Sequence, residues 1–114
     1  MRLIYHLARA AEWRAAQASG VYDGSAEDRA DGFLHFSTAA QIEESAARHR
    51  AGEADLVLLQ VDGAAAGDAL KWEASRGGAL FPHLYGSLPV AMVHRAEPLP
   101  LDDSGRHVFP LLEG

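Results

Sequence analysis

The sequence contains no cysteine, which excludes a disulfide framework, a thiolate nucleophile and a cysteine-ligated metal site. It also has no apolar run that approaches the roughly 20 residues of a membrane-spanning helix. The first residues, MRLIYHLARAAEW, carry too many charged side chains for a secretory signal peptide. We therefore expect a cytoplasmic protein with no membrane partner.

Basic residues are scarce. The chain has 10 lysines and arginines against 16 aspartates and glutamates, which gives a formal net charge of −6. The densest basic cluster, ARHRA at residues 47–51, lies next to Glu43, Glu44 and Glu53. Because bulk binding of nucleic acid requires many phosphates to be neutralised, neither nucleic acid nor an anionic membrane is an expected general partner.

The remaining composition is that of a small globular protein, with 48% apolar and 23% charged residues in a chain of 114. A chain of this length buries roughly 65% of the surface that its unfolded form exposes, which is enough for one core. No repeat, low-complexity tract or linker divides the chain. We therefore predict a single domain over residues 1–114, and a monomer.

The first part of the chain has the pattern of a strand followed by a helix. Residues 2–7 alternate as a strand that places Ile4 and His6 on the same face. Residues 8–19 are rich in alanine and other helix formers, and Gly20 follows as a stop signal. We expect a helix that ends at this glycine.

The next part predicts a loop, a strand and a second helix. Residues 22–32 are charged, glycine-bearing and aperiodic, which favours a mobile surface loop. Residues 32–36 form the second strand candidate. Thr38 and Gln41 then have the spacing of a capping box, a hydroxyl followed three residues later by an amide, so we expect a helix from Thr38 to about Ala51.

Strand character dominates the rest of the chain. Residues 54–62 are the most apolar and predict a central strand with both faces covered. Residues 70–73 alternate as a short strand, residues 74–89 predict a structured loop, and residues 90–99 resume strand character. A short final strand is expected around Val108. The succession predicts an α+β fold with a small mixed, largely antiparallel sheet or sheets and two main helices.

Four polar side chains interrupt apolar or glycine- and proline-bounded segments: His6, His35, Glu73 and His83. A histidine in a strand commonly bonds to a backbone carbonyl, and a lone glutamate commonly pairs with a neighbouring cation. Several such residues at strand ends or in a rigid loop are nevertheless typical of a site. If they form one, their side chains must converge on one concave pocket.

His35 lies in the run DGFLHFST. Strand alternation places His35 and Ser37 on one face, and Leu34 and Phe36 on the other. Because Leu34 and Phe36 can serve the core, the core does not require the His35 side chain. We therefore expect His35 to face a cleft.

Five motifs follow one another along the chain: IYHL, Trp13, DGFLHFST, LKWE and FPHLYG. Together they resemble the bacterial family catalogued as domain of unknown function 952, over about residues 3–97. That family is distantly similar to the ADP-ribosyltransferase fold, whose members hold NAD in a cleft between two small sheets. The resemblance implies an ADP-ribosyltransferase-like transferase with NAD as cofactor and a nucleotide as its small-molecule partner.

The resemblance also implies roles for individual residues. His6 would bind a ribose hydroxyl of NAD, His35 would occupy the aromatic position beside nicotinamide, and Glu73 would be the catalytic glutamate. Breaking the bond to nicotinamide develops oxocarbenium character on the ribose, which a nearby carboxylate stabilises. We therefore expect Glu73 and His35 to be catalytic. The other expected cofactor contacts are Ser37 and Thr38 or Arg76 at the pyrophosphate, Tyr85 as an alternative stacking ring, and His83.

Two other classes of function stay open. The same fold could serve as a non-catalytic module that binds a small ligand or a protein. The three histidines and Glu73 are also ligand types of zinc or iron enzymes, but the sequence has no HExxH or HxH pattern, and we expect no metal. The sequence also has no GxSxG elbow and no GxGxxG or P-loop fingerprint, so neither a serine hydrolase nor a Rossmann mode of NAD binding is favoured.

Overall fold

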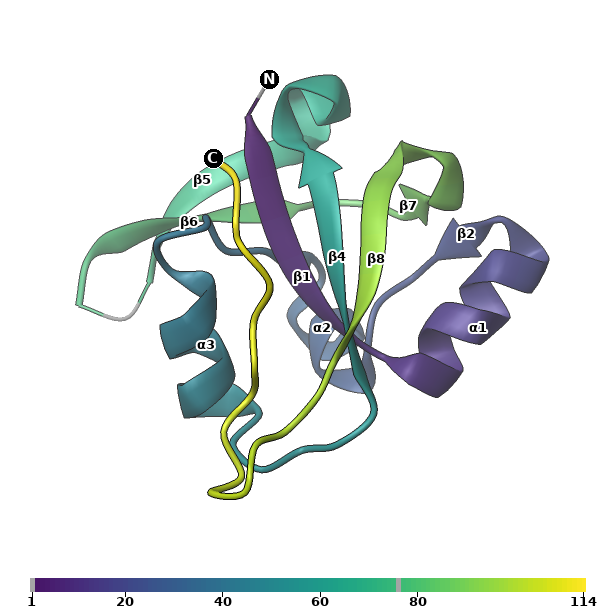
Figure 1. Cartoon of the computed structure of the whole chain (residues 1–114). Helices are drawn as coiled ribbons and strands as arrows, with labels where there is room; N and C mark the ends of the chain where they lie inside the picture. The colour runs from purple at the N-terminus through teal and green to yellow at the C-terminus, as the bar shows by residue number, and fades with distance from the viewer. Residues whose placement is uncertain (1, 76) are drawn as a thin grey trace.

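The computed structural model describes residues 2–75 and 77–114, which form three small antiparallel sheets with helices packed around them (Figure 1). The predicted α+β class is confirmed. The strands are β1 (Leu3–Arg9), β2 (Val21–Tyr22), β3 (Leu34–His35), β4 (Leu56–Asp62), β5 (Leu70–Ser75), β6 (Ala79–Leu84), β7 (Leu88–Pro89) and β8 (Val93–Leu99). The helices are α1 (Ala10–Ser19), α2 (Ala26–Asp31) and α3 (Ile42–His49), with 3₁₀ segments at Gly63–Ala69 and Val90–Met92.

The first sheet has the strand order β1-β4-β8, and its central strand is covered on both faces, as predicted. Leu59 and Val61 of β4 pack into one apolar cluster, whereas Leu56 and Leu58 pack into the other. Successive side chains of a strand point to opposite faces of the sheet, so β4 contributes to both clusters. The edge strand β8 begins at Val93, later than predicted, and it tolerates Pro98 because an edge strand does not need every N–H.

Helix α1 covers one face of this sheet at the right of Figure 1. Trp13 and Ala16 are its buried residues, and both belong to the same cluster as Ile4 and Leu59. The helix ends as predicted at Gly20, whose φ of 90° is readily adopted only without a Cβ.

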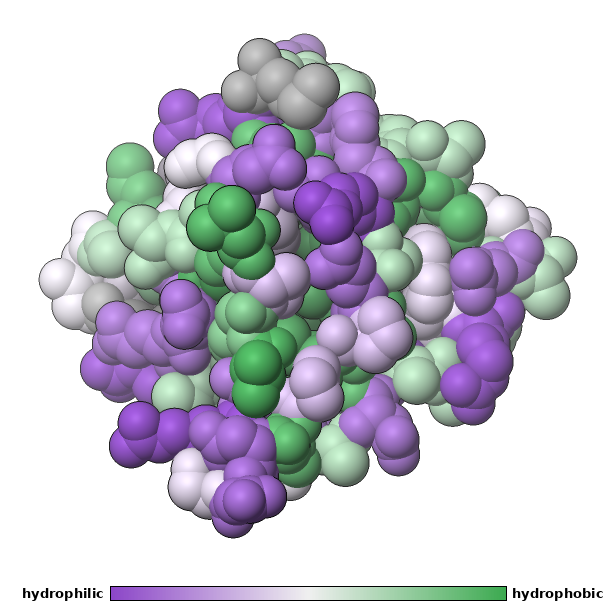
Figure 2. Space-filling model, viewed as in Figure 1, coloured by the Kyte–Doolittle hydropathy of each residue, from purple (hydrophilic) through white to green (hydrophobic). Residues whose placement is uncertain are grey.

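The C-terminal segment covers the opposite face of the first sheet and runs beside β1 and α3 (Figure 1). Phe109 and Leu112 pack against the cluster that contains Tyr5 and Ile42. The space-filling view shows apolar residues in a band along this segment (Figure 2). Leu111, a residue of the C-terminal segment, is 92% exposed. The predicted final strand does not form: Leu101 and His107 make an isolated bridge instead.

The second sheet has the order β3-β6-β5 and crosses behind the first in Figure 1. Residues 79–84 were expected to lie in a loop, and this expectation is wrong: they form the central strand β6. The prediction of a loop was based on the glycines on either side and on Pro82. In the structure β5 pairs with β6, the chain turns at Gly77 and Gly78, and the residues FPHL are extended. Tyr5 and Ser37 exchange two backbone hydrogen bonds of 2.8 Å, which join the two sheets.

Residues 22–32 are not a mobile loop, because they contain helix α2. Ser25 and Asp28 form a capping box: the Ser25 side chain accepts from the Asp28 N–H, and the Asp28 side chain accepts from the Ser25 N–H. Asp28 is 3% exposed, so this short helix is held by a buried carboxylate rather than by an apolar stripe.

Helix α3 begins at Ile42, after a turn, rather than at Thr38. Half of the predicted capping box is present, since the Thr38 N–H donates to Gln41 Oε1 at 3.0 Å. The helix ends at His49, two residues earlier than expected. Within residues 2–75 and 77–114, no helix is long and apolar enough to span a bilayer.

Candidate functional site

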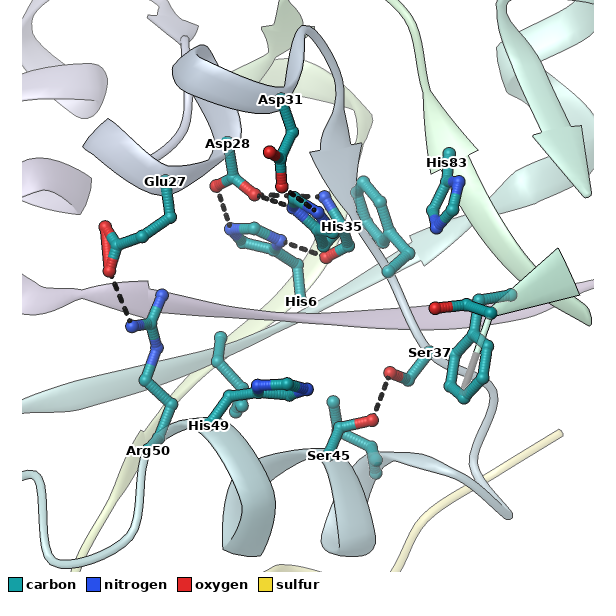
Figure 3. A pocket seen from close by; sticks show the side chains of 15 residues that line it. His6, Glu27, Asp28, Asp31, His35, Ser37, Ser45, His49, Arg50 and His83 are labelled. Carbon is teal, nitrogen blue, oxygen red and sulfur yellow. Dashed lines mark hydrogen bonds and ion pairs between the residues drawn. The ribbon is translucent and has the colours of Figure 1, made fainter. Parts of the chain in front are cut away.

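A pocket of about 350 Å³ lies where the two sheets meet, with walls from β1, α2, β3, α3, β5 and β6 (Figure 3). Its volume is in the range of small-ligand sites. Three histidines from separate strands, His6, His35 and His83, line it. The two-residue strand β3 brings His35 directly opposite His83 of β6.

His6 is locked in the floor of the pocket. Its Nδ1–H donates to the His35 carbonyl at 2.6 Å, and its Nε2 accepts from the Tyr22 hydroxyl at 2.8 Å. Burial lowers the pKa of His6, against the opposing attraction of Asp28, and this neutral form is the one that can accept from Tyr22. His6 therefore supports the main chain of β3 through Nδ1, and Tyr22 fixes its ring through Nε2.

Asp28 accepts four hydrogen bonds through its two oxygens. Oδ1 accepts from the His35 backbone N–H at 3.1 Å and from His35 Nδ1 at 2.5 Å. Oδ2 accepts from the N–H and the hydroxyl of Ser25 at 2.9 and 3.0 Å. Burial alone would raise the pKa of Asp28, but the bonds from His35 and Ser25 hold it well below its usual range.

His35 bridges two carboxylates. Its Nδ1 binds Asp28, and its Nε2 lies 2.9 Å from Asp31 Oδ2. The hydrogen bond to Asp28 and the charge of Asp31 raise the pKa of His35, against partial burial. Both ring nitrogens face carboxylates, and the imidazolium is the form that donates to both. Its side chain is 42% exposed and faces the pocket, as predicted.

A second carboxylate–imidazole pair stands on the neighbouring strands. His83 Nδ1 donates to Glu73 Oε1 at 2.8 Å, and the Tyr85 hydroxyl donates to the same oxygen at 2.8 Å. These bonds lower the pKa of Glu73 and raise the pKa of Tyr85. Phe33 stacks on His83 with ring centroids 4.1 Å apart, so the imidazole is oriented by both a carboxylate and a ring.

Helix α3 supplies the opposite wall with side chains at helical spacing, Ser45 and His49 among them (Figure 3). The hydroxyls of Ser37 and Ser45 lie 2.8 Å apart. Arg50, which directly follows the helix, pairs with Glu27 at 3.1 Å. This contact places a cation of 13% side-chain exposure on the pocket wall.

The structure brings together most of the residues predicted for the site. His6, His35, Ser37 and His83 line the pocket. Glu73 and Tyr85 stand behind His83 rather than among the lining residues. Thr38 bonds through its N–H to Gln41 and is not a lining residue. Arg76 lies outside the described residues.

The sequence prediction missed the acidic side of the site. Asp28 and Asp31 lie in the segment that was taken for a loop, and nothing in an apolar pattern marks them. The one local signal is the Ser25–Asp28 spacing of a capping box. Tyr22 and Arg50 carry no comparable signal, because their roles depend on contacts with residues distant in sequence.

The described part of the chain contains no group of three or more His, Cys, Asp or Glu residues arranged to hold a metal ion. Of the four residues considered for a metal site, His6 and His35 have both ring nitrogens bound within the protein, and His83 Nδ1 binds the Glu73 carboxylate. What the pocket offers instead is two imidazoles, each held by a carboxylate, which is an arrangement suited to proton transfer or to hydrogen bonding with a polar ligand.

The family model described as "Protein of unknown function (DUF952)" matches residues 7–96. The chain belongs to this family. A crystal structure of protein CC0527 from Caulobacter crescentus is similar, with 52% identity over 93% of each chain and a TM-score of 0.90. The solution NMR structure of CC0527 is 53% identical over 93% of this chain and 91% of that chain, with a TM-score of 0.83. No curated protein matches this DUF952 chain.

Proposed function

We propose that this DUF952 protein binds an NAD- or ADP-ribose-type nucleotide in the pocket between its two main sheets, as a member of the ADP-ribosyltransferase-like fold. The observation that carries the proposal is the convergence of His6, His35 and the Glu73–His83 pair on one pocket. These residues come from four different strands, and the order of His6, His35 and Glu73 along the chain resembles that of the three motifs of that fold.

The charge around the pocket suits the reaction. Transfer of ADP-ribose breaks a glycosidic bond to a cationic nicotinamide and develops positive charge on the ribose. Carboxylates near that ribose stabilise the charge, and Asp28, Asp31 and Glu27 all line the pocket. His35 Nε2 becomes a hydrogen-bond donor for a ligand oxygen when the ligand takes the place of Asp31.

Glu73 acts in this proposal through His83. Its Oε1 holds both His83 and Tyr85, so the carboxylate fixes the imidazole ring that faces the ligand. His83 then orients the acceptor hydroxyl or accepts its proton, and Glu73 stabilises the imidazolium that results. His6 is a positioning residue, because it holds the His35 main chain.

The binding half of the proposal is tested by thermal shift with millimolar NAD, ADP-ribose and nicotinamide. We expect NAD and ADP-ribose to raise the Tm of the wild-type protein, since a ligand that binds the native state stabilises it. His35→Asn should lose the shift, whereas His94→Asn, which changes a histidine of the exposed edge strand β8, should keep it. No shift with any of the three compounds would contradict the proposal.

A second candidate is a module that binds the nucleotide without turning it over. It is favoured because His6 and His35 each have both ring nitrogens bound to other groups of the protein, which leaves neither ring free to accept a proton from a substrate. Turnover distinguishes the transferase from the binding module. For the transferase we expect release of nicotinamide from NAD. Glu73→Gln should reduce the rate of this release by about 100-fold or more while nucleotide binding changes little. Nicotinamide is measured by chromatography. Binding without any release by the wild-type protein would establish the second candidate.

A further inference from the structure

The two carboxylates on His35 differ in how firmly they are held. The Asp28 side chain is 4% exposed, and Ser25 fixes its second oxygen. The Asp31 side chain is 56% exposed and reaches His35 Nε2 from helix α2 (Figure 3). One ring nitrogen of His35 is thus permanently occupied, and the other is covered by a surface side chain.

The position of Asp31 along α2 is electrostatically unfavourable. It is the last residue of the helix, where the free carbonyl groups repel an anion, and Asp28 adds a like charge nearby. The contact with His35 offsets this, but an ion pair with more than half of one partner exposed contributes little net stability. Displacing Asp31 from His35 should therefore cost little free energy.

We infer that Asp31 occupies the place of a ligand's anionic oxygen, and that the ligand of this pocket presents a phosphate oxygen to Nε2 of His35. This inference deepens the proposed nucleotide function and rests on it for the identity of the ligand: the oxygen belongs to the pyrophosphate. The role assigned to His35 thereby changes from a ring that stacks on nicotinamide to a hydrogen-bond donor to a phosphate oxygen.

The surroundings of His35 fit a phosphate group. Arg50 lines the same pocket as a second cation, with Glu27 as its carboxylate partner. The paired hydroxyls of Ser37 and Ser45 line the pocket as well. Charged hydrogen bonds from an imidazolium or a guanidinium are the strong contacts that phosphates use.

The test is the affinity of the Asp31→Asn protein for inorganic pyrophosphate and for ADP-ribose, measured by isothermal titration at fixed salt. Removing the competing charge should tighten both about three- to tenfold. Adenosine, which has no phosphate, should bind the variant and the wild type equally. Asp103→Asn makes the same change in net charge at an exposed position outside the pocket and should leave all affinities unchanged.

Two further variants test whether the gain in affinity comes from the loss of the Asp31 charge and acts through His35. Asp31→Ala should show the same gain as Asp31→Asn, and adding His35→Gln to Asp31→Asn should abolish the gain. Unchanged or weaker pyrophosphate binding by Asp31→Asn, or no pyrophosphate binding by any of these proteins, would overturn the inference. If pyrophosphate binding tightens while neither NAD nor ADP-ribose binds, the anion site stands and the proposed nucleotide function fails.

Discussion

At the scale of single residues, the site is organised by Asp28. This carboxylate closes the capping box of α2, fixes the ring of His35 and lies 3.7 Å from His6 Nε2. The sequence prediction identified the two histidines, because each interrupts an apolar strand. It missed Asp28 because a buried aspartate in a charged segment looks like any surface acid. Only its contacts with His6 and His35, which depend on the tertiary fold, distinguish it.

The Asp28–His35 pair makes stability depend on pH. The lowered pKa of Asp28 contributes stability that is present above its unfolded value near 4 and is lost as the pH falls through the folded value. The raised pKa of His35 contributes stability that is complete below its unfolded value near 6.5 and is lost as the pH rises through the folded value. The pair therefore stabilises the fold most at about pH 5 to 6.

Replacing Asp28 by Asn should lower the free energy of unfolding by about 2 kcal/mol in that pH range, since a buried charge partner is lost while His35 stays partly solvated. Urea denaturation of both proteins between pH 4 and pH 9 measures the difference. The difference should shrink toward pH 9, as His35 loses its proton. A difference that stays constant across this range would refute the coupling, and Asp103→Asn serves as the surface control.

At the scale of elements, the sequence predicted those that have a clear local signal. The first strand and the start of β5 alternate between apolar and polar residues, α1 is rich in helix formers and ends at a glycine, and β4 is the most apolar segment of the chain. Helix α2 was missed because it buries only Asp28, and β6 was missed because its glycine and proline neighbours are typical of loops. Helix α2 and strand β6 are both stabilised by contacts with other elements, and a local sequence pattern does not indicate such contacts.

The C-terminal segment is an element whose attachment can be tested. The Tyr5 hydroxyl donates to the Glu113 carbonyl at 2.6 Å, accepts from the Glu113 N–H at 3.0 Å and accepts from Gln60 Nε2 at 3.2 Å. Tyr5→Phe removes all three bonds and deprives the buried side-chain amide of Gln60 of its hydrogen bond to the hydroxyl. It should lower the free energy of unfolding by about 1–2 kcal/mol.

Hydrogen exchange provides the second measurement for this variant, because the Glu113 amide should exchange faster once Tyr5 no longer binds it. Tyr85→Phe is the matched control, since its hydroxyl bonds to the exposed Glu73 and its loss should change stability by a few tenths of a kcal/mol. Equal stability and equal protection of Glu113 in Tyr5→Phe would show that the segment is held by its apolar contacts alone.

At the scale of the whole molecule, the site depends on how two small sheets meet. The bridge between Tyr5 and Ser37 brings β1 against the end of β3, which places His6 under His35, and β6 then sets His83 opposite. Of the four side chains that the motifs predicted to converge, His6, His35 and His83 line the pocket. The motifs could not predict that Glu73 would stand behind His83 or that two aspartates would flank His35, because those positions follow from the docking of α2 and the sheets.

The central claim is that a nucleotide binds in this pocket beside His35 and His83. The most direct measurement is a titration of the histidine side-chain NMR signals with ADP-ribose at constant pH. The signals of His35 and His83 should shift together and saturate with one dissociation constant. Those of His94 and His107, which do not line the pocket, should stay in place. Shifts that are absent, that do not saturate, or that occur only at His94 and His107 would contradict the account.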